Sequence, residues 1–332
     1  MHHVSRVTQA WIAAGMAVFT LAACAQSQPV PVEKRSSDEA VQSLVARIKK
    51  QLVYLPAGTF EMGDWGSEEG LPYDMEKDSK PLHKVTLDGF SMMAYKVTYE
   101  DFDVFTETVG SPKINVELIE RWPGVRTPKR PAGVNWFGAQ AFCQWLGKVS
   151  GQPFDLPTEA QWEYAARSGG KRVLFATDNG KVDEGRNYPD DDYQFRLVTP
   201  EVGFYPPNPA GLYGMLDYSA TEWVNDWYQP DYYRRSPPKN PRGPKSGAID
   251  QRIPEFGPQK VTRGLLASSP AFGGFTFSRS AVWPYTRDQS LLRKVDRLIT
   301  DPSAGYSNRI GPQFRCVLND VAASMQTSSH YH

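Results

Sequence analysis

Apolar residues recur at the spacing of an amphipathic helix in three segments of the chain. The pattern predicts helices over residues 38–51, 135–149 and 158–167. Thr158 is suited to cap the third helix, because its hydroxyl can accept a hydrogen bond from a free backbone N–H in the first turn. The most regular apolar stripe lies in the second helix and consists of Trp136, Ala139, Phe142, Cys143 and Leu146.

Between these helices the pattern indicates short strands and long loops. Residues 52–55 and, with partial alternation, residues 85–99 are predicted to be strands. Residues 168–207 are acidic and irregular, and residues 234–259 are rich in proline, glycine and charge. Both segments are therefore expected to be loops.

The composition favours a loop-rich α+β domain. Glycine and proline each number 27, and aromatic residues make up 12% of the chain. We expect one domain over residues 52–320, followed by a polar tail over residues 321–332. Lysine and arginine number 37, as do aspartate and glutamate, so no net charge favours binding to nucleic acid. Five tryptophans in apolar contexts are predicted to fill the core: Trp136, Trp145, Trp162, Trp223 and Trp227.

Three charged residues of the third predicted helix are spaced four apart. Glu159, Glu163 and Arg167 therefore share one helix face and are expected to pair with each other. Arg263 and Arg315 are interpreted as arginines that tie loops together.

The amino terminus has the order of a lipoprotein signal peptide. An apolar run over residues 10–21 is shorter than the roughly 20 residues of a membrane-spanning helix. It ends in Leu21-Ala22-Ala23-Cys24, a lipobox with small residues before the cleavage site. We expect a cleaved signal peptide over residues 1–23, lipid chains on Cys24 and a tether over residues 24–37. Because no aspartate follows Cys24, a periplasmic location with an outer-membrane anchor is favoured.

Two further cysteines, Cys143 and Cys316, complete the cysteine content. An oxidising compartment permits a disulfide between them. Their spacing does not show whether they lie close enough to pair.

Six ordered blocks of the sequence resemble one known family. They are residues 55–63, 83–90 with 96–102, 131–145, 156–167, 207–215 with 222–227, and 263–264 with 314–316. The fourth block, LPTEAQWEYAAR, is the most specific. The chain resembles the formylglycine-generating-enzyme family, also called the sulfatase-modifying-factor family. The resemblance implies a loop-rich variant of the C-type-lectin fold.

The resemblance also locates the family's redox site. Founding members oxidise a substrate cysteine to formylglycine with two cysteines that hold copper. Cys316 matches the later of these cysteines, whereas Ser280 stands where the earlier one is expected. A hydroxyl is a poor ligand for Cu(I). Copper is therefore not expected, and Cys316, Ser280, Arg263 and Arg279 are interpreted as remnants of a catalytic site.

Calcium is a second implication of the resemblance. In the family, the segment that matches residues 215–223 supplies oxygen ligands to a structural calcium ion, and a second calcium site lies elsewhere in the domain. Here the first segment has one inserted residue and lacks the family's Gly-Asn pair. The candidate ligands are Asp217, Ser219 and Glu222 in this segment, and Asn187, Asp190 and Asp192 at the second site.

Three functions fit the resemblance. In the first, the chain is a lipoprotein that binds and inhibits a protein partner. Lipidated family members include immunity proteins against type VI secretion phospholipases, so a secreted lipase toxin is the expected partner. The second is a periplasmic oxidase or maturation enzyme, and the third is a structural envelope lipoprotein. Long loops that mix aromatic and charged residues favour binding. They cover residues 64–80, 112–129, 178–196 and 228–259.

Overall fold

The computed structural model describes most of the chain from Ser37 onward. The described ranges are residues 37–122, 124–190, 199–217, 221–265, 273–288, 297–299, 305–306 and 311–319. They belong to one compact unit. The predicted signal peptide, Cys24 and the polar tail lie outside the described residues. Within these ranges, no helix has the length and apolar character needed to span a membrane.

The three predicted helices are confirmed to within two residues at each end. The α-helices are α1 (Ser37–Lys50), α2 (Tyr99–Val109), α3 (Leu118–Arg121), α4 (Trp136–Ser150) and α5 (Glu159–Ala166). The short 3₁₀ helices are η1 (Gly66–Glu68), η2 (Tyr232–Arg234) and η3 (Pro254–Phe256). Thr158 caps α5 as predicted, because its side chain accepts from the backbone N–H of Gln161 while the Gln161 side chain accepts from Thr158 N–H.

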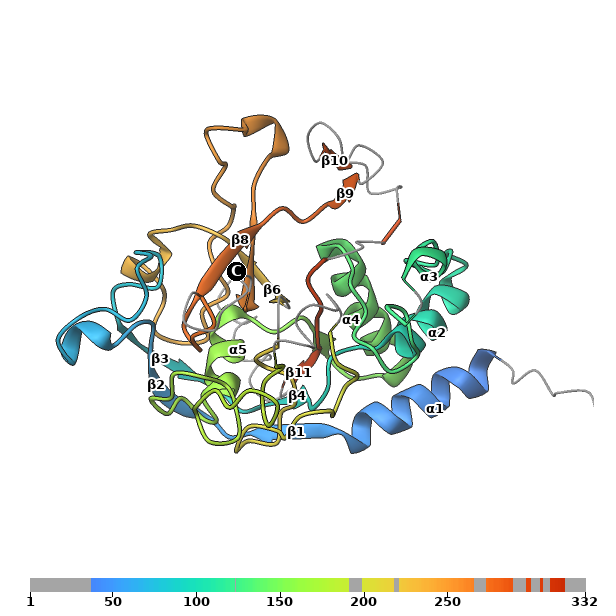
Figure 1. Cartoon of the computed structure of the whole chain (residues 1–332), viewed down its shortest axis with the longest axis horizontal. Coiled ribbons are helices and arrows are strands. Elements are labelled where there is room, and N and C mark those ends of the chain that lie inside the picture. The colour runs from blue at the N-terminus through green and yellow to red at the C-terminus, as the bar shows by residue number, and fades with distance from the viewer. Residues whose placement is uncertain are drawn as a thin grey trace, which may run out of the picture. The chain divides into compact units, whose positions relative to one another are not determined.

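Short antiparallel strands form four small sheets in the described part of the chain (Figure 1). A four-stranded sheet has the order β1 (Leu52–Leu55), β4 (Phe90–Met93), β11 (Val317–Asn319), β5 (Phe154–Asp155). A three-stranded sheet has the order β6 (Thr221–Trp227), β7 (Lys260–Gly264), β8 (Arg279–Val282). Two hairpin-like pairs join β2 (Gly58–Met62) to β3 (His83–Leu87) and β9 (Thr286–Asp288) to β10 (Arg297–Ile299).

The prediction of one strand over residues 85–99 is wrong. The segment contains the end of β3 and then β4, and these two strands belong to different sheets. Asp88 marks the break, because its backbone N–H donates to Asn240 Oδ1 and its carboxylate accepts from Asn240 Nδ2. Beyond β4 the chain turns into α2, which Thr98 caps. The partial alternation in the sequence was that of two short strands.

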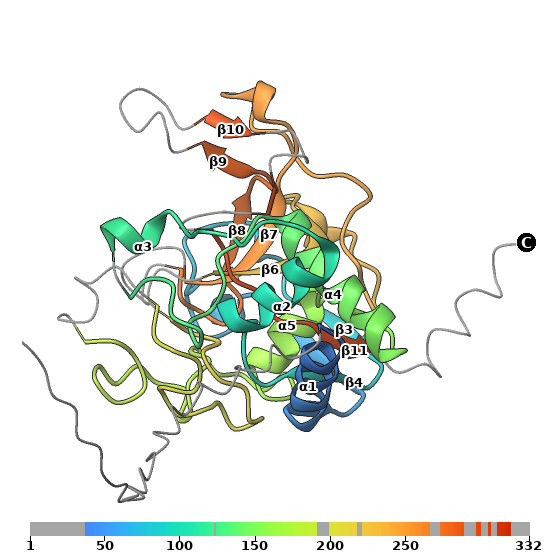
Figure 2. The same cartoon turned by 90° about the vertical axis from the view of Figure 1, so that its right-hand side faces the viewer.

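The core consists of two large clusters of buried side chains, and the four-stranded sheet contributes residues to both. One cluster surrounds α5 and β2–β3. The other lies among α1, α2 and α4, three helices that lie close together in both views of the ribbon (Figures 1 and 2). Four of the five predicted core tryptophans are buried, whereas Trp227 is only half-buried. In the described residues, the predicted loops over residues 168–207 and 234–259 contain no helix or strand apart from η3 and the last residue of η2.

Candidate functional site

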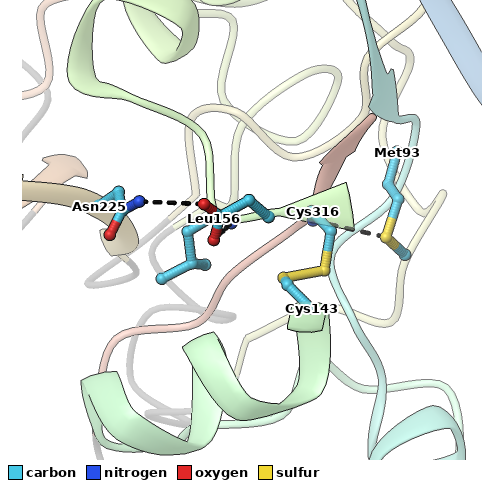
Figure 3. The surroundings of a disulfide bond; sticks show 6 residues. Met93, Cys143, Leu156, Asn225 and Cys316 are labelled. Atoms are coloured by element: carbon cyan, nitrogen blue, oxygen red, sulfur yellow. Dashed lines mark hydrogen bonds between the residues drawn. A yellow bond between two sulfur atoms is a disulfide. The ribbon is translucent and has the colours of Figure 1, made fainter. Parts of the chain in front are cut away.

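Cys316 lies directly before β11 and forms a disulfide with Cys143 of α4 (Figure 3). Both residues are fully buried. The bond closes a loop of 173 residues and joins the helical side of the core to the four-stranded sheet. Cys143 is a core residue as expected, but Cys316 is not a free thiol. Neither sulfur is available as a thiolate ligand for a metal.

Ser280 lies in the three-stranded sheet, whereas the strand that follows Cys316 belongs to the four-stranded sheet. Ser280 is a half-buried residue of β8, directly opposite Thr262 of β7. The two positions that the resemblance assigned to a copper site are therefore a strand hydroxyl and one end of a structural disulfide.

The neighbouring Arg279 and Arg263 hold a buried carboxylate between them. Arg279 Nε and Nη2 donate to the two oxygens of Glu159 at 2.6 and 3.0 Å. Arg263 Nη1 donates to Glu159 Oε1 at 3.0 Å. Burial by itself raises the pKa of Glu159, but the two arginines outweigh it and lower the pKa below its ordinary value. Glu159 is therefore ionised at neutral pH and belongs to a buried ion-pair cluster.

Glu163, one turn further along α5, extends this cluster. Its Oε2 accepts from Arg263 Nη2 at 2.8 Å, and its Oε1 accepts from Arg167 Nη1 at 2.9 Å. Oε1 also accepts from the backbone N–H of Gly63, at the end of β2. The predicted pairing of Glu163 with Arg167 is confirmed, whereas Glu159 pairs with arginines of β7 and β8 instead of its helix neighbours.

The guanidinium groups of this cluster have no exposed surface that a substrate could reach. The side chains of Arg167, Arg263 and Arg279 are 0% exposed. Each also donates to backbone carbonyls, such as Thr276 O for Arg263 and Asp78 O for Arg279. The arrangement fixes α5 against β7, β8 and the loop before β3. It is built to stabilise the fold.

Lys260, which no sequence pattern singled out, lies near this cluster. The Nζ of Lys260 sits between two indole rings, 3.8 Å from the centroid of Trp136 and 3.9 Å from that of Trp227. It donates to Asn225 O at 2.8 Å. Burial lowers the pKa of Lys260 to about 8, although the nearby carboxylate of Asp226 acts to raise it. No spacing rule links these positions, which come together only when β6 and β7 pair and α4 packs on them.

Asp226 is buried next to Glu159. Its Oδ2 accepts from the backbone N–H of Glu159 at 2.9 Å. Burial, and then the negative charge of Glu159, raise the pKa of Asp226 to about 7. At neutral pH this carboxyl group is therefore partly protonated in the folded protein.

Replacing Asp226 should change how stability depends on pH. The unfolded chain releases this proton near pH 4 and the folded protein near pH 7, so the contribution of Asp226 to stability is complete below about pH 4 and is lost as the pH rises toward 7. Asp226→Asn has no such proton to release, so the difference in free energy of unfolding between this variant and wild type should grow in favour of the variant as the pH rises. The limiting slope of this difference is about 1.4 kcal/mol per pH unit in that window. Urea unfolding from about pH 4.5 to 7 measures this. Glu255→Gln, at an exposed position, is the control and should keep the pH dependence of wild type. If the free energy of unfolding fell equally with pH in wild type and Asp226→Asn, the raised pKa of Asp226 would be contradicted.

The candidate calcium ligands of the first segment lie in ion pairs with the chain's own cations. Lys96 Nζ donates to Asp217 Oδ2 at 2.6 Å. Arg315 binds both oxygens of Glu222, at 2.8 and 2.9 Å. The third candidate, Ser219, lies outside the described residues.

The second set of calcium candidates belongs to the loop after α5. The Asn187 side chain accepts from Asp183 N–H and donates to Asp178 Oδ1. Arg186 bridges Asp178 and Asp183 at 2.7 and 2.6 Å. Asp190 is described and has an interaction of its own, whereas Asp192 lies outside the described residues. Within the described ranges, no three His, Cys, Asp or Glu side chains form a group that could hold a metal ion.

The loop over residues 64–80 is fixed from within and presents apolar side chains to solvent. Asp64 accepts from the backbone N–H groups of Gly66 and Asp74 at 2.8 and 3.0 Å. The Asp74 carboxylate in turn accepts from the Ser278 hydroxyl. Leu71 and Met75 are nevertheless 81% and 91% exposed. Two exposed apolar side chains thus lie on a loop whose backbone is held by hydrogen bonds.

The sequence matches a known family whose members include formylglycine-generating enzymes. Residues 38–292 match the Sulfatase-modifying factor enzyme 1-like domain. The chain belongs to this family, and the predicted α+β, formylglycine-generating-enzyme-like fold is confirmed.

Three proteins are similar to this chain, each over a different share of its length. The formylglycine-generating enzyme of Streptomyces coelicolor is 32% identical over 253 residues, which cover 59% of this chain and 75% of that enzyme. The serine/threonine-protein kinase pkn1 of Chlamydia pneumoniae is 35% identical over 218 residues, or 60% of this chain and 32% of the kinase. The chain thus spans about a third of that relative. The structure of PvdO from Pseudomonas aeruginosa has a TM-score of 0.56 at 21% identity, covering 81% of this chain and 94% of PvdO.

Proposed function

We propose that this chain is a binding protein of the sulfatase-modifying-factor family that does not carry out the oxidase chemistry of formylglycine-generating enzymes. The disulfide between Cys143 and Cys316 carries the proposal. It removes the thiolate at the position of a copper ligand, and Ser280 offers a hydroxyl at the other. The arginines beside Ser280 support it too, because their guanidinium groups are engaged in buried ion pairs.

The disulfide also supports an extracytoplasmic location. Stable disulfides form in oxidising compartments such as the bacterial periplasm. The lipobox that ends at Cys24 supports the same compartment and an attachment to the membrane through lipid. We therefore place the binding function on a lipid-anchored periplasmic protein, with the outer membrane as its site of attachment.

The loop over residues 64–80 is the best-supported contact surface for a protein partner. Its two most exposed apolar side chains are Leu71 and Met75, and its exposed charged residues are mainly acidic, with Glu68, Glu69 and Glu76 against Lys77. A partner that fits this surface presents an apolar recess with basic residues around it.

We further propose that this binding protein is an immunity protein that inhibits a phospholipase effector of type VI secretion. It rests on the family resemblance, the lipobox and the contact loop. Such a toxin attacks membrane lipids from the compartment in which the lipobox would hold this chain.

A copper assay tests the non-catalytic proposal. The full chain, supplied with Cu(I), oxygen and a reductant, should oxidise a cysteine-containing peptide no faster than its Cys316→Ala variant. The Streptomyces coelicolor enzyme serves as the positive control. Thiol-dependent turnover that disappears in Cys316→Ala would overturn the proposal.

An inhibition assay tests the binding proposal. The probe is a secreted phospholipase encoded beside the gene for this chain. Wild type should inhibit it, and Leu71→Ser with Met75→Ser should weaken inhibition about tenfold or more without lowering Tm, as expected when contact hot spots are removed. Val149→Ser, an exposed apolar residue at the end of α4, is the matched control. A lipase that neither binds nor responds to wild type would refute the immunity role.

A further inference from the structure

Lys96 is buried against the segment over residues 215–223, from which calcium ligands were expected. Lys96 and Asp217 are 2% and 6% exposed, and their charged atoms lie 2.6 Å apart. The pair forms part of the lining of a surface depression, together with Tyr95 and Tyr213. The rings of these two tyrosines stack with centroids 4.6 Å apart.

Arg315 occupies the adjacent oxygen-rich position. Besides both Glu222 oxygens, it binds the backbone carbonyls of Met93 and Ala94 at 3.2 and 3.0 Å and that of Tyr213 at 2.8 Å. Two carboxylate oxygens and three carbonyls thus surround one guanidinium. Carboxylates and carbonyls are the groups that coordinate calcium in proteins.

This donor set does not fit a divalent cation. Calcium needs six to eight oxygen ligands. Here the carboxylates of Asp217 and Glu222 are each bound to a buried cation. A calcium ion on the same oxygens would lie within a few ångströms of an ammonium and a guanidinium group, at a large electrostatic cost in a poorly solvated interior.

We propose that Lys96 takes the place of a divalent cation in this segment, so that the fold around Asp217 does not depend on calcium. Burial raises the pKa of Asp217 and the ammonium group of Lys96 opposes that effect, as a neutralising cation does. Gly214 lets the loop close over the pair, since a Cβ at this position would lie 2.8 Å from Asp217 Oδ2. The proposal is independent of the proposed function.

The first experiment compares calcium with chelator. The Tm of the full wild-type chain should be the same in excess Ca²⁺ and in excess EDTA. Lys96→Ala removes the ammonium group and leaves Asp217 buried without its cation, so its Tm should be lower in EDTA and should rise on addition of Ca²⁺. Lys96→Arg, which keeps a cation, should again show no response to Ca²⁺.

Terbium luminescence provides a second readout at the same place. Tb³⁺ binds calcium sites, and its emission can be excited through a nearby tyrosine, here Tyr95 or Tyr213. Lys96→Ala should bind Tb³⁺ at concentrations at least tenfold below those needed for wild type. The double variant Lys96→Ala with Asp217→Asn should lose this signal, which separates the site from acidic residues elsewhere on the surface.

Two results would overturn the proposal. One is a wild-type chain that gains stability from Ca²⁺, or sensitises Tb³⁺, in a manner that Asp217→Asn abolishes. The other is a folded Lys96→Ala variant that neither binds Tb³⁺ nor gains stability from Ca²⁺, because the remaining oxygens are then no cation site. If Lys96→Ala does not fold, the wild-type titration with Asp217→Asn as its control decides.

Discussion

Replacing Arg263 with methionine should lower the free energy of unfolding by about 3–5 kcal/mol, the usual cost of removing one partner from a buried ion pair. Arg263 links two carboxylates of α5, Glu159 and Glu163, and its side chain is 0% exposed. Methionine fills much of the same space but leaves both carboxylates with one arginine fewer. Urea unfolding followed by tryptophan fluorescence measures the loss.

Arg252 provides a matched control of the same residue type. It pairs with Asp250 at 2.7 Å, but its side chain is 88% exposed. Arg252→Met should therefore cost less than about 1 kcal/mol. If Arg263→Met cost no more than Arg252→Met, the buried cluster would not be the support for α5 that its geometry indicates. A folded Arg263→Met with unchanged stability would reopen a functional role for this arginine.

Local patterns predicted those parts of the fold that depend on neighbouring residues. The apolar stripe of α4 and the capping box of α5 are set within a few residues of sequence, and both elements formed as predicted. The prediction for residues 85–99 was wrong because the structure of this segment depends on residues far away in the sequence. Its two halves pair with strands of different sheets, and Asp88 between them is bound by Asn240, 152 residues further along the chain.

The partners of buried charges were beyond the reach of spacing rules. Helical periodicity paired Glu163 correctly with Arg167, four residues away. It could not find that Glu159 pairs with Arg263 and Arg279, which lie 104 and 120 residues further along the chain. Lys260 gave no signal either, because its tryptophan slot is created by the packing of α4 on β6 and β7.

Residues singled out by the family resemblance serve this fold as supports. Arg263 and Arg279 hold α5, Glu222 and Arg315 join β6 to the segment before β11, and Cys316 is bonded to α4. Such a core can hold loops in fixed positions without a reactive group. This is the arrangement that a protein needs when its function lies in the loops it presents.

Reducing the disulfide between Cys143 and Cys316 should lower the free energy of unfolding about as much as Arg263→Met does. For a closed loop of 173 residues, loop-closure entropy gives about 5 kcal/mol, and measured disulfides of this kind contribute about 2–5 kcal/mol. Reduction changes no atoms except the two thiols, so the midpoint of urea unfolding with and without a reductant measures the bond. The double variant Cys143→Ala with Cys316→Ala is the control, because a reductant should not change its midpoint.

The single variant Cys143→Ala connects this bond to function. It frees the thiol of Cys316 while Ser280 stays in place, so it should lose stability without gaining copper-dependent oxidation of a peptide. If reduction left wild-type stability unchanged, the two sulfurs would not be bonded in the protein. If Cys143→Ala became an oxidase, the disulfide would be a lock on a catalytic thiol, and the binding-only function would be wrong. Loss of stability alone is the outcome that the buried positions of both cysteines predict.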